Sequence, residues 1–471
     1  MKPLPRIPDL PTEFQATIEW LLRVEDYVLA KSLLERVLAY GPQNNPALMD
    51  YQAMVLYHGK FYQEAQEVAE RTLRVLPGNA NASYNLARCQ NASGRPDLAE
   101  RSMKAVLKAN PQWPSAIIDM AVYVCSQGRF EEAYEMLLQV QNALPAGHSE
   151  LDIVRFNLGW HLIRKGKFKE GMDCLRIGRK LRIWGAYSNN LKKPVLEKHT
   201  NVQGKRILIV GEGGAGDEII NARFAQVLKS RGAVPMMVSN QKLEGLLSGA
   251  RDLAVVSSGK ESANIEFDYW VPAMDMPQIL ELDLHEIPSG AYLQAPSTLM
   301  SKWRNIIPAG GKLKVGLRWQ GNPLYERDLY RSVPFTEFGV FLENPDIEFY
   351  SLQRDSGVEE IIPGSPVKDL SSELKTWEDA AAAISCLDLV ISSCTSIAHL
   401  AAALGKKTWV YTPINHYYIW ASPGEKSAWY PDVTLFRQKT FKEWSDCTNQ
   451  MKPLLEALSL RSKSENLEVK I

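Results

Sequence analysis

Hydrophobic positions along this chain follow a helical period in its first third and form strand-length runs in the remainder. In the first third, small residues that fit between packed helices recur with separations of 35, 34, 34 and 38, at Ala30, Ala65, Ala99, Ala133 and Gly171. Prolines recur at nearly the same interval, at Pro42, Pro77, Pro111 and Pro145. The pattern predicts five similar helical hairpins over roughly residues 12–183.

The length of the repeat points to its class. A period near 34 residues is typical of the tetratricopeptide repeat (TPR), and GRPDLAE, GRFEEAYEMLL and GKFKEGMDCL resemble the junction between its two helices. Hairpins of this kind bury their apolar faces by stacking, which makes a solenoid with a concave surface. That surface favours a protein partner, although a spacer or dimerisation arm would show the same pattern. Aromatic residues on the predicted first helices are either packing residues or peptide contacts: Tyr51, Tyr84, Trp113, Tyr123 and Trp160.

After an irregular basic stretch near Lys180 to Lys205, apolar runs of strand length alternate with amphipathic helical stretches. Residues 206–239 and 389–412 each read as strand, turn, helix and strand, and KLKVGLRWQGNP begins a further unit at residue 312. Successive α/β segments of this kind predict two doubly wound lobes around a cleft. We therefore expect an α-solenoid followed by α/β lobes.

Three domains follow from this organisation. We expect TPR-like repeats over residues 1–192, a first lobe over 193–310 and a second lobe over 311–471. In the two lobes, residues that bind ligands should lie at the carboxyl ends of the strands, where open α/β sheets form their crevice.

Composition excludes some functions. The 54 basic and 54 acidic residues balance, so no net charge draws the chain onto nucleic acid or an anionic membrane. The start MKPLPRIPDLPTEF resembles no secretory signal, and no run of about eighteen apolar residues predicts a transmembrane helix, so we expect a cytoplasmic protein. The six cysteines lack C-x-x-C spacing, which favours thiols used as small core residues over disulfides or zinc ligands.

The most informative motif is the turn within LVISSCTSIAHLAAALGKKTWVYT. Hydroxyl groups gather where the predicted strand ends and the helix begins, on Ser392, Ser393, Thr395 and Ser396. Together with the free N–H groups and the positive end of the helix, they predict a phosphate site. A well-capped βαβ unit without a ligand would contain the same residue types. His399, one turn further on, favours a ligand, but a buried structural histidine is the alternative.

A glycine-rich turn follows the first predicted strand of the α/β part. Gly211, Gly213 and Gly216 satisfy G-x-G-x-x-G. A nicotinamide dinucleotide site would need an acidic residue near the end of the next strand, and this chain has Ser239 and Asn240 there. The glycines instead let a substrate approach the backbone closely.

Asp217 follows this turn, in the first turn of the predicted helix. As an acid at a helix N-terminus it could simply complement the helix dipole. As a carboxylate at the carboxyl end of a strand, facing the crevice, it could take the proton from an attacking hydroxyl group. We favour the second interpretation because the glycines clear space around the carboxylate.

Six segments, in order, resemble bacterial TPR-fused glycosyltransferases related to the heptosyltransferases of glycosyltransferase family 9: GEGGAGDEIINARF, GLRWQGNP, RSVPF, FYSLQRD, DLVISSCTSIAHLAAALGKKTWVY and SAWYPDVTLFRQ. The resemblance covers roughly residues 200–440 and the repeats. It implies a GT-B fold, a nucleotide sugar held mainly by the second lobe, no metal or other cofactor, and inversion at the anomeric carbon.

The resemblance also assigns residues. The aspartate proposed as the family's base falls on Asp217, and Gly213, Gly214 and Gly216 form the acceptor-side glycine loop. The family's basic residue that meets the donor phosphates falls on Arg331, where Pro334 keeps the following proline and Val333 replaces a tryptophan. The small-residue turn and its histidine fall on Thr395, Ser396 and His399.

Further candidates come from the chemistry of the reaction. Cleaving a sugar from a nucleotide builds negative charge on the leaving phosphate, so a catalyst without metal needs fixed cations and hydrogen-bond donors there. Residues at the strand ends of the second lobe can meet the donor, namely Arg318, Gln320, Asn322, Gln353 and Arg354. Trp319 is placed beside them, and Trp319 and Gln320 could equally make only local loop contacts.

One departure from the family pattern concerns the donor. The family has an aspartate before the threonine of the turn, and this chain has Cys394. Losing that hydrogen-bond acceptor puts a heptose donor in doubt. The sequence thus predicts a glycosyltransferase acting on a protein held by the repeats, with flagellin suggested by analogy. The alternatives are a lipopolysaccharide or lipid-linked acceptor, and a non-catalytic adaptor with a degenerate GT-B domain.

Overall fold

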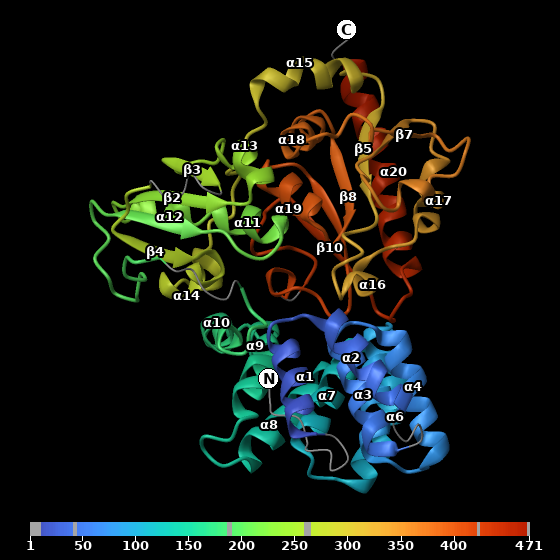
Figure 1. Cartoon of the computed structure of the whole chain (residues 1–471). Coiled ribbons are helices and arrows are strands. Elements are labelled where there is room, and N and C mark those ends of the chain that lie inside the picture. Colours follow the sequence, from blue (N-terminus) through green and yellow to red (C-terminus); the bar gives the residue numbers. More distant parts are fainter. Residues whose placement is uncertain (1–10, 41–44, 186–190, 259–264, 422–423, 469–471) are drawn as a thin grey trace. The chain divides into compact units, whose positions relative to one another are not determined.

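The structure, a computed structural model, forms two compact units, Met1–Glu150 and Leu151–Ile471 (Figure 1). The stretches that the structure describes are 11–40, 45–185, 191–258, 265–421 and 424–468.

The described part of the first unit consists of helices in antiparallel pairs. Their bounds are α1 Thr12–Arg23, α2 Tyr27–Tyr40, α3 Pro46–His58, α4 Tyr62–Val75, α5 Ala80–Ala92, α6 Pro96–Ala109, α7 Pro114–Ser126 and α8 Phe130–Ala143. The small residues that set the period are buried, since Ala30, Ala65, Ala99 and Ala133 are each 0% exposed. The first four predicted hairpins are therefore present, and the repeating alanines lie where neighbouring helices pack.

The aromatic residues on the first helices of these hairpins divide into two groups. Tyr51 and Tyr123 are buried packing residues. Tyr84 and Trp113 are half-buried and stack on each other with ring centroids 4.8 Å apart, and the Tyr84 hydroxyl donates to Asp119 Oδ2 at 2.7 Å. The partly accessible surface of α5 and α7 thus combines an aromatic pair with a carboxylate.

The fifth predicted hairpin belongs to the second unit. It comprises α9 (Leu151–Arg164) and α10 (Phe168–Arg176), followed by the short helix η1 (Ile177–Arg179). Its apolar side chains Ile163, Phe168, Met172 and Leu175, with Trp184 just after it, share one continuous core with the first β-strand of the α/β part. The compact units divide before this hairpin, after Glu150, because the hairpin packs on the α/β part, while the domain bounds at residues 192 and 310 stay predictions.

Two parallel sheets make up the rest of the second unit. The first has the order β3-β2-β1-β4 and the second the order β10-β9-β8-β5-β6-β7. The strands are β1 Arg206–Val210, β2 Val234–Ser239, β3 Val255–Ser258, β4 Tyr269–Pro272, β5 Leu313–Arg318, β6 Ile347–Ser351, β7 Val367–Asp369, β8 Leu389–Ser393, β9 Thr408–Thr412 and β10 Val433–Arg437.

Helices connect these strands and cover the sheets, as the ribbon in Figure 1 shows. The α-helices are α11 Ala215–Ala222, α12 Ala225–Ser230, α13 Glu244–Leu247, α14 Met276–Ile279, α15 Ser297–Ile306, α16 Asp328–Arg331, α17 Gly339–Leu342, α18 Trp377–Ser385, α19 Ser396–Ala403 and α20 Ser445–Glu468. The second sheet, taken in chain order from β5, has the strand order 3-2-1-4-5-6 that is typical of a doubly wound nucleotide-binding domain. The fold-class prediction, helical repeats followed by two doubly wound lobes of the GT-B kind, is confirmed.

The two lobes meet along α11 and α19. A Cβ atom added to Gly216 of α11 would lie 3.3 Å from His399 Cδ2 and 3.5 Å from Ser396 Cα, both on α19. Deeper in the interface, the buried Arg223 guanidinium donates to the Trp429 carbonyl at 2.6 Å. The first turns of the two helices are therefore neighbours, which places the glycine turn beside the serine-rich turn.

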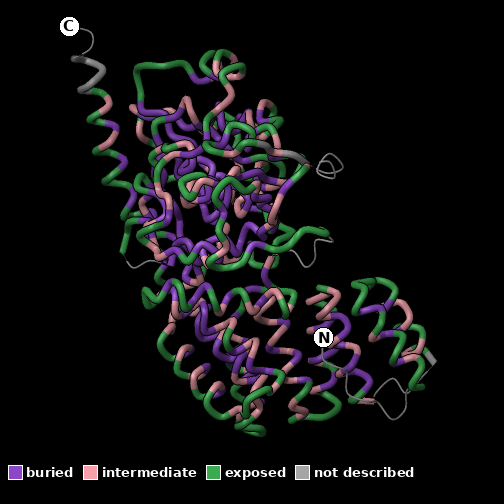
Figure 2. The backbone as a smooth tube through the Cα atoms, turned by 90° about the vertical axis from the view of Figure 1, so that its left-hand side faces the viewer, coloured by how far each residue is buried: buried purple, intermediate pink, exposed green. Residues whose placement is uncertain are grey.

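Strands β1, β5, β8 and β9 are almost wholly buried, and Figure 2 marks the buried positions of the chain in purple. All six cysteines are free, and Cys89, Cys125, Cys394 and Cys447 are buried. Of the described helices, none is long and apolar enough to cross a membrane.

The shared core predicts where the chain can be divided. A protein beginning at Leu151 should fold, whereas one beginning at Lys193 should not, because it lacks the α9–α10 side chains that complete the core. Each large apolar side chain among them contributes about 1.5–3 kcal/mol of burial, and together they approach the whole stability of a typical domain, about 5–15 kcal/mol. Thermal unfolding followed by circular dichroism checks this, and equal melting temperatures for the two proteins would contradict it.

Candidate functional site

The candidate site lies at the topological switch point of the second sheet, between β5 and β8. These strands are neighbours in register, with Arg318 opposite Ser392, and their connections leave the sheet in opposite directions. Ligands of open α/β sheets bind in such a crevice, at the carboxyl ends of the strands. The glycine turn after β1 approaches the same crevice from the first lobe.

The glycine turn is built around the Asp217 carboxylate. Gly213 has φ +78°, and a Cβ atom there would lie 2.6 Å from Asp217 Oδ2. Gly214 is the N-cap of α11, and its N–H donates to Asp217 Oδ2 at 2.8 Å. Gly216 permits the close approach to α19. The first of these glycines leaves room for the carboxylate, and the last leaves room for the other lobe.

Asp217 is held from both lobes. Besides the Gly214 amide, it accepts a 2.7 Å hydrogen bond at Oδ1 from the hydroxyl of Tyr417, which follows β9 in the second lobe. Burial raises the pKa of Asp217, and the hydrogen bonds from Tyr417 and Gly214 oppose that rise. The capping role considered from the sequence is present. The bond to Tyr417 additionally fixes the carboxylate at the interface between the lobes.

Arg331 links α16 to the serine-rich turn. Its Nε donates to Asp328 Oδ1 at 2.9 Å, and a terminal nitrogen donates to the Cys394 carbonyl at 3.1 Å. The guanidinium also lies 4.6 Å from the centroid of the Tyr325 ring. These contacts fix a cation at the end of β8, where the sequence predicted a phosphate contact, although Asp328 neutralises part of its charge.

Arg318 is a second cation in the crevice. It donates to the Leu352 carbonyl at 3.0 Å, while its Nε is buried without a hydrogen-bond partner among the described residues. Burial is the main reason that the pKa of Arg318 falls to about 10; the charges of Asp355 and Asp328 oppose this fall, and those of Arg331 and Arg354 add to it. A guanidinium with a buried, unused donor is a favourable partner for an anion.

The serine-rich turn keeps other polar groups unused. Thr395 is the N-cap of α19 but makes no side-chain cap, because its hydroxyl lies 3.1 Å from Ser392 Oγ. Within the described structure, Ser393 Oγ is buried and has no partner, while Ser396 is half-buried. The turn therefore presents a helix N-terminus that its own side chains do not cap, as a phosphate site requires.

His399 is buried one turn into α19. Its ring stacks on Trp420 with centroids 4.9 Å apart and planes 9° apart. Burial, assisted by Arg223 and Arg331, lowers the pKa of His399 to about 3, so the ring is neutral at physiological pH. Its Nδ1 has no hydrogen-bond partner among the described residues. The histidine thus packs between the lobes and keeps one ring nitrogen available to a ligand or water.

Gln353 and Trp319 form the support of the β5 loop. The Gln353 side chain accepts from the N–H groups of Trp319 and Gln320 and donates to the carbonyls of Gln320 and Ser356. Those four bonds use the whole capacity of the amide. Trp319 is 0% exposed, and its ring centroid lies 4.7 Å from that of Phe335. Both residues therefore position the loop, and neither presents a free polar group to a donor.

The remaining candidates lie at the edges of the crevice. Gln320 Oε1 is buried without a partner among the described residues. Asn322 is exposed and accepts from the Leu324 N–H at 3.0 Å, a local turn contact. Arg354 donates to the Lys375 carbonyl at 3.0 Å and keeps half of its side chain exposed. Arg354 adds to the positive potential, and Asn322 shapes the loop.

Cys394 occupies the position where the resembling family has an aspartate. Its Sγ accepts from the Trp420 indole at 3.3 Å, and burial raises the pKa of the thiol. The side chain is therefore a neutral packing group that presents no carboxylate to a sugar.

Several functional candidates were not found from the sequence. Tyr417, which is hydrogen-bonded to Asp217, lies in the segment after β9. Its position beyond the carboxyl end of a parallel strand was the one sequence feature that could have indicated a role in the site. Glu218, next to Asp217, accepts from the Asn240 N–H at 2.9 Å, and burial raises its pKa to about 7. The sequence shows that Glu218 is next to Asp217, but it does not show that Glu218 is buried.

The first lobe's own switch point is filled by an ion-pair network. Arg179 of η1 donates to Glu212 at 2.9 Å and to Asp275 at 2.8 Å, at the ends of β1 and β4. Arg176 also pairs with Asp275 at 3.1 Å. The helical segment after α10 is thus paired with carboxylates at the carboxyl ends of β1 and β4.

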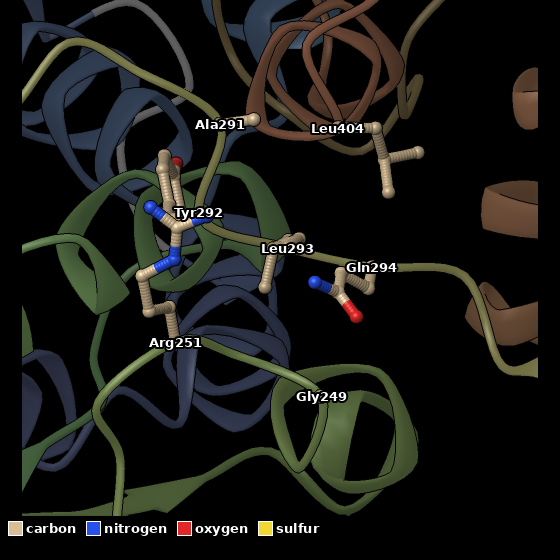
Figure 3. Close-up of a pocket in the computed structure, with 7 residues that line it drawn as sticks. All are labelled: Gly249, Arg251, Ala291, Tyr292, Leu293, Gln294 and Leu404. Atoms are coloured by element: carbon tan, nitrogen blue, oxygen red, sulfur yellow. The ribbon is translucent and has the colours of Figure 1, made fainter.

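A separate hollow of about 470 Å³ lies between the lobes at the other end of α19. Figure 3 shows the linker segment 291–294 running between Gly249 and Leu404. Leu404 follows the last turn of α19, whereas the serine-rich turn precedes its first. The hollow is therefore distinct from the candidate site.

Residues 60–117 match the sequence profile of the tetratricopeptide repeat, which confirms the predicted repeat class. Protein FlbA of Caulobacter vibrioides is 22% identical to this chain over 482 residues, covering 89% of this chain and 80% of FlbA.

Among solved structures, the glycosyl transferase family 9 protein from Veillonella parvula DSM 2008 is 13% identical, with a TM-score of 0.44, covering 56% of this chain and 99% of that one. MamA from Desulfovibrio magneticus RS-1 is 19% identical, with a TM-score of 0.29, covering 36% of this chain and 93% of that one. At these identities, function has to be argued from the residues of the site.

The geometry of the glycine turn predicts a contrast between neighbouring glycines. Gly213→Ala should destabilise the protein by about 1–2 kcal/mol, because a Cβ atom is disfavoured at φ +78° and would press on the Asp217 carboxylate. Gly214→Ala is the matched control, since its Cβ would lie 3.7 Å from Asp217, an ordinary contact. Urea unfolding measures both. Equal losses would show that the space around Asp217 is not constrained as described.

Proposed function

We propose that this chain is an inverting, metal-independent glycosyltransferase that moves a sugar from a nucleotide donor to a hydroxyl group of a protein acceptor. The observation that carries the proposal is the juxtaposition of two turns from different lobes. One presents cations and an uncapped helix N-terminus, and the other presents a carboxylate. A transferase of this type needs both groups on opposite sides of the anomeric carbon.

The second lobe supplies the donor side. The leaving nucleoside phosphate gains negative charge as the bond to the anomeric carbon breaks, and fixed positive groups stabilise that charge. Arg331 and the first turn of α19 lie where the phosphates would bind, and the unpartnered Nε of Arg318 can add a further hydrogen bond. Typical donors at such sites each contribute about 2.7–4 kcal/mol to transition-state stabilisation. These groups provide the charge stabilisation that a metal ion supplies in other transferases.

The first lobe supplies the base. In a single displacement, the acceptor oxygen attacks the anomeric carbon, the bond to phosphate breaks, and the leaving nucleotide takes the electron pair. The acceptor's proton passes to Asp217. Burial raises the pKa of this carboxyl group, which makes its ionised form a stronger base than an exposed aspartate.

The donor sugar is constrained by Cys394. A carboxylate at this position could accept hydrogen bonds from sugar hydroxyls, whereas the buried thiol is bonded to Trp420. A heptose donor is therefore disfavoured. A non-catalytic adaptor remains the second candidate, and the same replacement of aspartate by cysteine favours it, while Asp217 and Arg331 count against it.

The repeats favour a protein acceptor. The first unit carries the half-buried pair Tyr84 and Trp113 next to Asp119, a combination suited to an extended peptide. Flagellin is the acceptor we would test first, by analogy with other repeat-fused transferases. A lipid-linked or lipopolysaccharide acceptor is the alternative.

The donor assignment predicts a loss of nucleotide binding in Arg331→Ala. A ligand that binds only the folded protein raises its melting temperature, so UDP-, GDP-, dTDP-, ADP- and CMP-sugars are compared by thermal shift. The sugar nucleotide that stabilises the wild type should bind Arg331→Ala at least about tenfold more weakly, the effect of losing about 1.4 kcal/mol. Arg327→Ala removes an exposed arginine just before α16 and serves as the control. An unchanged dissociation constant in Arg331→Ala would remove this residue from the phosphate site.

The base assignment predicts the opposite pattern in Asp217→Asn. Transfer should fall by at least about a hundredfold, the lower end of the contribution of a general base, while donor affinity changes little because the carboxylate serves the acceptor. Isothermal titration calorimetry measures donor binding, and release of the nucleotide measures turnover. Wild-type turnover in this variant would exclude Asp217 as the base.

The acceptor assignment predicts separate roles for the two units. A protein beginning at Leu151 should bind the donor and hydrolyse it slowly, yet fail to glycosylate flagellin, because removing the repeats removes the effective concentration of the target hydroxyl. Residues 1–150 should retain flagellin without any nucleotide sugar present. Efficient glycosylation by the shortened protein would show instead that the repeats are a spacer or assembly arm, and would favour a small or lipid-linked acceptor.

A further inference from the structure

The α9–α10 hairpin, which the sequence assigns to the repeats, packs against the segment that carries Tyr417. Trp160 of α9 lies 6.0 Å from the Tyr417 ring, and Arg164 of the same helix donates to Asn415 at 2.8 Å. Trp184 continues this aromatic contact, with its ring 6.0 Å from Trp160 and 5.7 Å from Tyr418. The segment after β9 is therefore held by the hairpin as well as by its own lobe.

The Tyr417 hydroxyl then reaches the other lobe, where it donates to Asp217 Oδ1 at 2.7 Å. The second carboxylate oxygen is already bonded to the Gly214 amide. A carboxylate bonded at both oxygens has one orientation, and a hydrogen bond donated to its charged form favours that form. Burial and the neighbouring carboxylate raise the pKa of Tyr417 well above its usual range, so the phenol remains a donor.

We propose that Tyr417 is a positioning residue for Asp217, and that the α9–α10 hairpin belongs to the catalytic unit because it holds Tyr417 in place. The inference rests on the proposed function, since it gives Asp217 a reason to be fixed. In this arrangement the phenol donates a hydrogen bond and keeps its proton, while Asp217 remains the group that accepts the proton of the acceptor.

The ionisable groups around Asp217 come from several elements. They are Glu212 in the glycine turn, Glu218 on α11, Tyr325 and Arg331 near α16, Cys394 in the serine-rich turn, and Tyr417 and Tyr418 after β9. Among them, Tyr417 makes the side-chain hydrogen bond to Asp217, and the Arg331 charge acts in the same direction. Removing the phenol hydroxyl should therefore disfavour the ionised carboxylate while the other charges stay in place.

The decisive experiment compares Tyr417→Phe with Tyr418→Phe in the full chain. Both substitutions delete one buried phenol oxygen, but the Tyr418 hydroxyl has no partner within the described structure, which makes it a matched control. With 13Cγ-labelled aspartate, the Asp217 resonance is assigned by its absence in Asp217→Asn and followed against pH. Because a donor to the carboxylate is lost, the midpoint in Tyr417→Phe should rise by about 1 pH unit. In Tyr418→Phe it should stay at the wild-type value.

A second measurement keeps the proposal testable if Tyr417→Phe is poorly folded. Trp160→Phe removes part of the contact that holds Tyr417 and leaves the hydroxyl in the chain. It should move the Asp217 midpoint in the same direction by a smaller amount, whereas Arg155→Ala, at an exposed position of the same helix, should not. An Asp217 midpoint that is unchanged in both Tyr417→Phe and Trp160→Phe would overturn the proposal.

This outcome is separate from failure of the proposed function. The titration needs no sugar nucleotide, so a shift in Tyr417→Phe supports the positioning of Asp217 whatever the donor. If no sugar nucleotide raises the melting temperature of the wild type, the transferase proposal fails even where the titration behaves as expected. If the sugar nucleotides bind and the titration does not respond, only the role of Tyr417 is lost.

Discussion

Helices α11 and α19 approach each other so closely that a methyl group on Gly216 would press against His399. The rest of the site depends on this contact, because it brings together two turns from separate sheets. Each sheet alone would offer a helix N-terminus in open solvent. With the helices in contact, the glycine turn that holds the Asp217 carboxylate lies beside the serine-rich turn of the other lobe, and both lie partly out of water, where electrostatic interactions are stronger.

The two lobes contribute side chains of opposite charge to the candidate site. Arg331 and Arg318 stand on the side of the second lobe, and Asp217 stands on the side of the first. The chain has no net charge overall. Positive and negative side chains are nevertheless separated locally, because the fold brings together residues that are distant in sequence. Asp328 pairs with Arg331 and so offsets part of its positive charge. This pairing stabilises the cation when no anion is bound. Nε of Arg318 and Oγ of Ser393 are buried without a hydrogen-bond partner among the described residues.

The second unit also shows how a repeat can become part of the domain that follows it. The α9–α10 hairpin keeps the repeat pattern in its sequence, yet its apolar face is covered by the first lobe, and Arg179 just beyond it fills that lobe's switch point. This ion-pair network occupies the carboxyl ends of β1 and β4. The same hairpin reaches the segment after β9 through Trp160, which connects the end of the repeats to the interface between the lobes.

The sequence by itself determined the period of the repeats, the strand–turn–helix units and the types of residue in the two turns. These are local properties: a helical period of buried alanines, a glycine required at the positive φ of Gly213, and hydroxyl groups at the start of a helix all follow from interactions within a few residues. The fold class could be predicted for the same reason, since alternating strands and helices have few stable arrangements.

Only the tertiary structure decided which of those residues face one another. Gln353 and Trp319 resembled ligand contacts in the sequence, but the packing of the β5 loop uses their polar groups and buries the indole. Conversely, Tyr417 acquires a role only because its lobe packs on α11, at a separation of 200 residues from Asp217. Local sequence sets the conformation of each turn. The pairing of side chains across an interface depends instead on how two sheets pack on each other, which no short-range pattern encodes.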